Sequence, residues 1–144
     1  MRCFNQTNRA TYGRDSIKVT LNNDTAANYS LHSLYGDGAT VGAYGTASTA
    51  FMEMGNTTTS VATNIFGIQI IDVLDYANTN KYKTLRALNG GDHNGTIASL
   101  GATVGLASGN WRSTSAVTRL DILPYTGTLF TQYSSFALYG IKGA

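Results

Sequence analysis

The feature that most constrains the fold is an alternation of apolar and polar residues in the last third of the chain. In the run 116–123, Leu120 and Ile122 fall on one face of an extended chain, while Arg119 and Asp121 fall on the other. The run 135–141 is similarly patterned, and a turn region at 124–128 separates the two. A period of two is typical of β-strands bounded by turns. We therefore expect two strands here, the second an interior strand of a sandwich.

The rest of the chain repeats this pattern of short runs between turn residues. Further strands are expected at Ser16–Leu21, Asn28–Tyr35, Thr49–Met54 and Ile97–Leu106, with turns at Asn56–Thr59 and Ser108–Asn110 and a loop at Thr40–Ser48. Residues 60–66 fit a strand or a short helical turn. Gly67–Tyr76 and Lys81–Leu88 predict a β-hairpin, and Ile68–Asp72, apolar on both sides, predicts a central strand.

About eight to ten strands with turn signals every ~8–12 residues predict an all-β, antiparallel β-sandwich of the jelly-roll kind. The polar start of the chain predicts an N-terminal arm or edge segment at residues 1–15, followed by one sandwich domain at residues 16–144. A chain of 144 residues suits this division.

Composition argues against several classes of function. Only 12% of the residues are charged and the net charge is +2, so neither nucleic acid nor an anionic membrane surface is an expected partner. No run approaches the ~20 apolar residues of a membrane-spanning helix. Cys3 is the one cysteine and is expected to be an ordinary unpaired residue. We expect no cofactor and no metal site, because no Cys/His cluster is present.

Candidate catalytic residues are few, and each has a simpler structural explanation. His32 is expected to be a surface or hydrogen-bonded strand residue, and His93 lies beside Asp92 in the polar loop 89–95 without a nucleophile motif. That loop matches a calcium loop in composition only. Asp72 and Asp75 could act as a glycosidase pair. An offset of three places them on opposite faces of a strand. We therefore favour a structural role, in which they cap the strand end and bond to the loop, or pair with Lys81 and Lys83 across the hairpin.

Aromatic residues indicate binding or assembly rather than catalysis. Trp111 is the sole tryptophan and is expected to be buried at the mouth of the sandwich, although an exposed position would suggest a sugar platform. Nine tyrosines are present, and four of them precede glycine: Tyr12, Tyr35, Tyr44 and Tyr139. Tyrosine is enriched at protein interfaces.

Three segments form a set: Leu21–Gly38, Ile71–Arg86, and Trp111–Thr118 with the strand that continues it and the F-x-L-Y-G-I-K-G ending at Phe136–Gly143. Together they resemble a family of tailed-bacteriophage virion proteins and phage fibre-end domains. The similarity covers about residues 16–144, and its motifs are structural. It implies a jelly-roll-like sandwich that acts in an assembled particle, often as a homotrimer.

Within this family two roles compete. One is a capsid decoration (cement) protein on the outer face of the major capsid shell, and the other is a tail-fibre or spike tip that binds a host receptor or glycan. The chain reaches its sandwich within about fifteen residues and shows no shaft heptads, which favours decoration. The expected partners are the major capsid protein and copies of the chain itself, and the expected location is the virion. We expect the functional surface at Gly36–Ser48, at Asn89–Gly95 and on the N-terminal arm.

Overall fold

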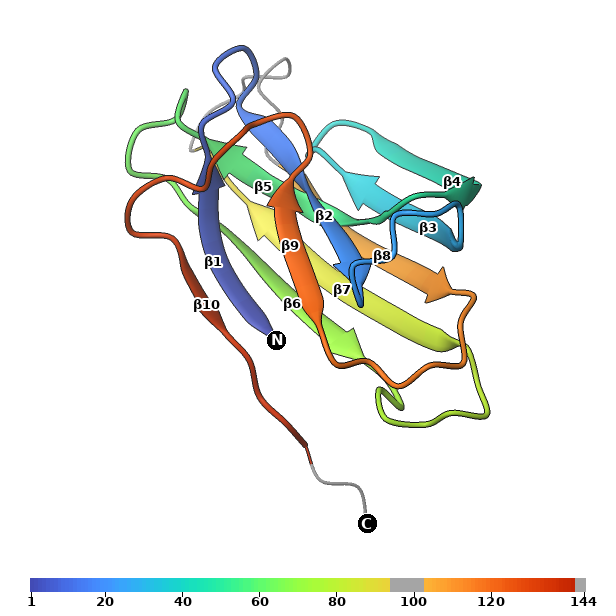
Figure 1. Cartoon of the computed structure of the whole chain (residues 1–144). Coiled ribbons are helices and arrows are strands. Elements are labelled where there is room, and N and C mark those ends of the chain that lie inside the picture. The colour runs from blue at the N-terminus through green and yellow to red at the C-terminus, as the bar shows by residue number, and fades with distance from the viewer. Residues whose placement is uncertain (94–102, 142–144) are drawn as a thin grey trace.

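The computed structural model describes residues 1–93 and 103–141, and this part of the chain is all β (Figure 1). Its ten strands are β1 (Arg2–Thr7), β2 (Arg14–Leu21), β3 (Tyr29–Gly36), β4 (Val41–Thr49), β5 (Met52–Thr59), β6 (Gly67–Val73), β7 (Lys83–Gly91), β8 (Thr103–Trp111), β9 (Leu120–Pro124) and β10 (Ser135–Ala137). The all-β class is therefore confirmed.

The strands form one strongly curled sheet in the order β4-β3-β8-β7-β6-β1-β5-β2-β9, with β10 paired to β1. The sheet bends back at β1, so that β5 packs across β7 and β8 (Figure 1). The expectation of a purely antiparallel sandwich is wrong, because β1 and β5 pair in parallel through Gln6–Thr58 and Thr7–Thr59. A jelly-roll arrangement stays a prediction.

The first strand is not the arm or edge segment expected for residues 1–15. β1 pairs with β6 on one side, and on the other it pairs first with β10 and then with β5. Apart from Cys3, its buried side chains are polar, and each makes at least one hydrogen bond, although Asn5 Oδ1 accepts none among the described residues. Asn5 Nδ2 donates to Gln69 Oε1 at 2.5 Å, and Gln6 Nε2 donates to the carbonyls of Ala62 and Ile65, both at 2.9 Å. Hydrogen bonding thus makes a polar strand suitable for the interior.

The core lies between the two arms of the curled sheet. Alternation along β2, β6, β7 and β8 points every second side chain inward. The buried apolar cluster comprises Cys3, Ile17, Val19, Leu21, Tyr29, Met52, Met54, Ile71, Leu85, Ala87, Ala107 and Trp111. The absence of a side chain at Gly109 lets β5 approach closely, because an added Cβ would lie 2.6 Å from Met52 Sδ. β5 and β8 therefore pack closely against each other across the core.

The C-terminal third departs from expectation. Leu120 and Ile122 pack against the core as predicted. The second strand, expected at 135–141 in the interior, is only the three-residue β10, and Phe136 and Leu138 are 42% and 73% exposed. β1 pairs with this segment only as far as Ala137. The apolar residues beyond it therefore lie on the surface.

Several strand limits also differ from the predictions. The expected loop at 40–48 is largely β4, the expected turns at 56–59 and 108–110 lie inside β5 and β8, and residues 60–66 form turns rather than a strand. Of the strand expected at 97–106, residues 97–102 lie outside the described residues. The β6–β7 hairpin is confirmed, as is the central position of β6 between β1 and β7.

Asp15 ties the two arms together. Its buried carboxylate accepts hydrogen bonds from Thr7 Oγ1 at 2.9 Å, from the Thr126 amide at 3.0 Å and from the Gly127 amide at 2.8 Å. The Ser16 amide donates a fourth bond at 2.9 Å. One side chain thereby joins β1, β2 and the segment that follows β9.

We predict that Asp15→Ala lowers the free energy of unfolding by about 3 kcal/mol, because it leaves buried donors without an acceptor. Urea denaturation of the purified protein measures this. Asp75→Asn is the control, since it removes the charge of an exposed ion pair with Lys81 and keeps a residue type that tolerates the φ of 50° at this position. Equal losses in the two variants would contradict the role of Asp15.

Candidate interaction surface

The outward face of β1, β6, β7, β8, β3 and β4 carries a continuous band of exposed apolar side chains, which we call the apolar stripe. Its members are Phe4, Leu34, Val41, Ile68, Ile70, Leu88, Val104 and Leu106. The members on β1, β6, β7 and β8 each lie between two buried residues, and Leu34 and Val41 share their face by strand register. The side chains of the stripe are therefore not part of the core.

The stripe is built by strand register. In one row, Ile70 lies opposite Leu88, Leu88 opposite Leu106, and Leu106 opposite Leu34. In the adjacent row, Phe4 lies opposite Ile68, while Val104 and Val41 are both opposite Gly36. Six neighbouring strands at ~4.8 Å spacing give the stripe a length of about 24 Å. Directly opposed side chains lie close enough to touch in the first row, which makes the stripe continuous there, whereas Gly90 and Gly36 interrupt the second row.

The stripe is larger than folding alone explains. Its members are 37–87% exposed. Eight large side chains in that state present roughly 600–800 Å² of apolar surface, whereas the largest patch of an ordinary monomer is about 300–600 Å². Such a surface is typical of a protein-binding face.

A polar row borders the stripe on the same face. Asp72 lies opposite Arg86 and forms an ion pair with it, with 2.7 Å between Oδ2 and Nη2. Ser108 and His32 continue this row on β8 and β3. The face is thus divided into an apolar half and a polar half, as in the core and rim of a protein interface.

The second row of the stripe has a gap at Gly90. Gly90 lies between Ile68 and Val104 in the register, and no described atom beyond its two chain neighbours lies within 4 Å of the position that its Cβ would occupy. This glycine needs no positive φ and fills no close contact within the chain. It leaves room for a side chain or backbone of a partner between two apolar neighbours.

The candidate carboxylates are held in ion pairs. Asp75 pairs with Lys81, as predicted, with 2.8 Å between Oδ2 and Nζ, whereas Asp72 pairs with Arg86 rather than with Lys83. Lys83 is buried, and its Nζ donates to the carbonyls of Asn78 at 2.6 Å, Lys81 at 2.8 Å and Thr114 at 3.2 Å. Its three N–H groups are thus satisfied by backbone, which the sequence pattern does not reveal.

The histidines do not meet. His32 is exposed on β3 and its ring covers Gly45 of β4, where an added Cβ would lie 2.6 Å from Cδ2. His93 follows β7, and its Nε2 makes no hydrogen bond to the residues that the structure describes. Asn89–Gly91 of the expected 89–95 loop belong to β7, and residues 94 and 95 lie outside the described ranges. Within residues 1–93 and 103–141, no three His, Cys, Asp or Glu side chains group as metal ligands.

Trp111 is buried, as predicted, and so offers no sugar platform. Its ring stacks on Tyr29 at 6.4 Å, and its Nε1 donates to Asp24 Oδ2 at 2.7 Å. This hydrogen bond is the main reason that the pKa of Asp24 lies below its ordinary value, and a hydrogen bond from Asn28 is the next largest cause. The pair fixes the β2–β3 turn against the end of β8.

The other singled-out residues are scattered. Cys3 is buried in the core, where desolvation raises its thiol pKa to about 11. Tyr35 and Tyr44 meet edge to face at 6.4 Å across β3 and β4, and burial raises the pKa of Tyr44. Tyr12 is exposed near the start of β2. These four positions therefore do not form one site.

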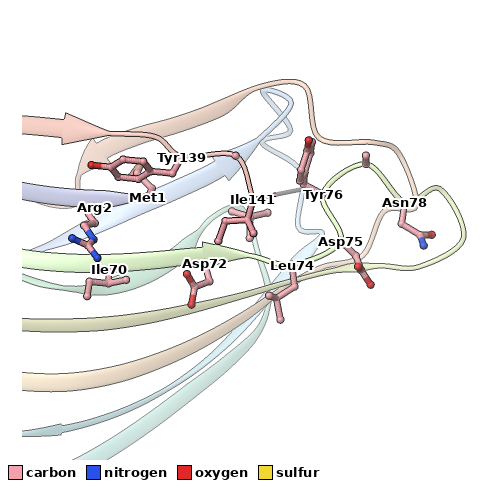
Figure 2. A pocket seen from close by; sticks show the side chains of 13 residues that line it. Met1, Arg2, Ile70, Asp72, Leu74, Asp75, Tyr76, Asn78, Tyr139 and Ile141 are labelled. Atoms are coloured by element: carbon pink, nitrogen blue, oxygen red, sulfur yellow. The ribbon is translucent and has the colours of Figure 1, made fainter. Parts of the chain in front are cut away.

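An open hollow of about 990 Å³ lies where the chain start, the end of β6 and the C-terminal segment meet (Figure 2). Figure 2 shows Tyr139 and Ile141 coming from the C-terminal segment, and Tyr76 and Asn78 from the β6–β7 connection. Asp72 also lines it. Exposed aromatic rings, carboxylates and an amide are suited to contacts with polar organic ligands.

The fold is thus that of an all-β protein with a mixed, curled sheet, one face of which is apolar and is not covered by any of the described strands or connections. A scan of family models and searches of curated proteins and of solved structures each returned no match. The resemblance to phage virion proteins stays a prediction. Among the described residues, there is no helix with the length and apolarity to cross a membrane.

The sequence contained one signal of the stripe. Ile68, Ile70 and Ile71 make β6 apolar on both faces, which predicts a central strand. The structure confirms this, but adds that Ile68 and Ile70 point outward and align with residues of β1, β7 and β8. That alignment depends on register between strands distant in sequence, which a single sequence does not show.

We predict that the fluorescence of Trp111 reports on Asp24. The folded-state pKa of Asp24 lies below the ordinary 3.8, so its stabilising contribution is complete above that pH and is lost as pH falls through the folded value. Thermal unfolding followed by Trp111 fluorescence from pH 6 to 2 should show a falling melting temperature below about pH 4.

In Asp24→Asn this acid-dependent decline should be shallower, and stability at pH 6 should be lower. Asp37→Asn should also make the decline shallower, because the amides of Thr40 and Ala39 lower the Asp37 pKa to about 2 and its carboxylate therefore loses its own stabilising contribution in acid. An unchanged acid decline in Asp24→Asn would contradict the assignment.

Proposed function

We propose that the chain is a structural protein of a bacteriophage virion, a capsid decoration protein bound to the outer face of the major capsid shell. The apolar stripe is the observation that carries the proposal. A rigid sheet face of roughly 600–800 Å² is close to the ~800 Å² that each partner contributes to a standard interface. The low charge and the sequence resemblance favour a capsid surface as the partner.

The mechanism is burial of the stripe against the shell. Contact would remove Leu88, Leu106 and their neighbours from water, while the polar row of Asp72 and Arg86 stays at the rim. Area alone does not set affinity, because association and side-chain ordering oppose it. Many copies on one lattice would nevertheless reinforce one another and the shell, because neighbouring contacts add as avidity.

We predict that Leu106→Glu lowers occupancy on phage particles at least tenfold, because it places a charge in the centre of the buried surface. Purified variants are added to particles lacking the protein, and bound copies are quantified by mass spectrometry. The same particles are imaged to locate the density.

Ser108→Glu is the matched control, since it lies on the same strand and face but in the polar row. It should retain occupancy, and both variants should keep the melting temperature of the parent. Equal occupancy of the two variants, or density confined to the tail, would reject the decoration role.

The hollow of Figure 2 favours a second candidate function, a tail-fibre or spike tip that binds a host glycan. Tyr76 and Tyr139 are exposed aromatic rings at this hollow. Aromatic faces contact the apolar side of sugars, and Asp72 and Asn78 could hydrogen-bond to hydroxyls.

We expect Tyr76→Ala and Tyr139→Ala each to weaken binding of host polysaccharide about tenfold if this second role holds, since a ring contact is worth about 1 kcal/mol or more. Binding is measured by calorimetry or on immobilised polysaccharide. Tyr133→Ala is the control, because Tyr133 is exposed but does not line the hollow. No binding by the parent protein would reject the tip role.

A further inference from the structure

Strand β4 presents a long open edge. It lies at one end of the sheet and pairs only with β3 among the described strands (Figure 1). Its nine residues, VGAYGTAST, include no charged residue and no proline. Within the described chain, no backbone hydrogen bond joins β4 to anything other than β3. The N–H and C=O groups of β4 that point away from β3, in the plane of the sheet, can therefore pair with another strand.

The other ends of the sheet are protected. β9 is five residues long, ends in Pro124, and carries Asp121 in an ion pair with Arg119, with 2.7 Å between the paired atoms. β10 has only three residues. Proline, charge and shortness are the usual means of blocking edge pairing, and β4 has none of them.

The edge of β4 is also regular. Residues 41–47 pair with 30–36 of β3 without interruption, and the one irregularity falls beyond them, where Ser48 has a φ of 56°. Gly42 and Gly45 leave space for the rings of Tyr35 and His32, each 2.6 Å from an added Cβ. These rings cover the glycines from β3, which is a known way to stabilise glycine in an edge strand.

We propose that β4 pairs antiparallel with β4 of a second copy, so that two sheets join into one across a two-fold axis. A strand that pairs with itself about such an axis must be compatible with its own sequence. β4 meets this condition, because no charged residues face each other whichever of residues 43–45 lies on the axis, and the one large side chain in this range, Tyr44, then faces Gly42, Tyr44 or Thr46 of the second copy. A two-fold contact of this kind closes after two copies.

The pairing has a geometric consequence for the outward face. The two-fold axis of an antiparallel strand pair is perpendicular to the sheet, so both outward faces lie on the same side. Val41 and Ala43 lie on β4 opposite Gly36 and Leu34. The two apolar stripes would therefore meet at the axis and form one surface of twice the length. The pairing itself does not depend on what that surface binds.

The association is expected to be weak, because an edge contact buries less than the ~800 Å² per partner of a standard interface. Sedimentation of the purified 15.3 kDa chain from about 1 to 500 μM should show a monomer–dimer equilibrium with a Kd of roughly 1–100 μM. The β4 amides that point away from β3 should exchange slowly with solvent deuterium at the high protein concentration and rapidly at the low one.

The variant is Thr46→Lys/Ala47→Lys, which places four additional positive charges near the axis of a dimer. It should weaken dimerisation at least tenfold. Ser108→Lys is the matched control, because it adds a charge to the polar row two strands inward and should dimerise as the parent does. Thermal unfolding verifies that each variant is folded, and the concentration-dependent exchange of the unaltered protein tests the proposal without any substitution.

Three outcomes would overturn the proposal: a monomer with unprotected β4 at 500 μM, a trimer such as the phage resemblance implies, or a dimer that the double variant leaves intact. Leu106→Glu separates this test from that of the virion role. If Leu106→Glu loses particle binding but still dimerises, the dimer does not depend on the stripe, whereas dimerisation without any particle binding by the parent rejects only the virion role.

Discussion

The rest of the structure depends on strand β1, which both arms of the curled sheet share. Its first half is held between β6 and β10, and its second half runs parallel to β5. Buried polar contacts hold this junction: Asn5 with Gln69, Thr57 Oγ1 with the Asn5 carbonyl at 2.7 Å, and Thr7 with Asp15. These contacts have specific geometry, so they fix the angle at which the sheet folds back.

Closing the sheet at β1 explains why one face is buried and the other is not. The inner faces of β7 and β8 are covered by β5, and their buried residues are small or fully packed. No described element covers the outer face, although Leu88 and Leu106 are as apolar as the core. Opposed pairs along the stripe contribute to the pairing of the strands. Even so, a band of exposed apolar side chains across six strands is at the upper end of what ordinary monomers present to water.

The fold class and the β6–β7 hairpin could be predicted from sequence, because both follow from local alternation and turn residues. β1 could not, since Asn5, Gln6 and Thr7 are polar and their burial depends on partners distant in sequence. β4 resembled a loop because Gly42 and Gly45 are poor strand formers alone, and the rings that cover them belong to β3. Conversely, residues 138–141 alternate well but lack a strand to pair with. Tertiary pairing outweighed local propensity in each case.

The apolar stripe and the β4 edge use different chemical groups in perpendicular directions. The stripe offers side chains along the normal to the sheet, and its partner needs only a complementary apolar surface. The β4 edge offers backbone N–H and C=O groups in the plane of the sheet, and its partner must be another strand. Since the two directions do not compete, one copy can use both at once. Pairing in the plane would place two stripes on a common surface and so double the area that could contact a lattice. Binding of one stripe would raise the effective concentration of the other. The dimer would therefore bind the lattice more tightly than one copy does.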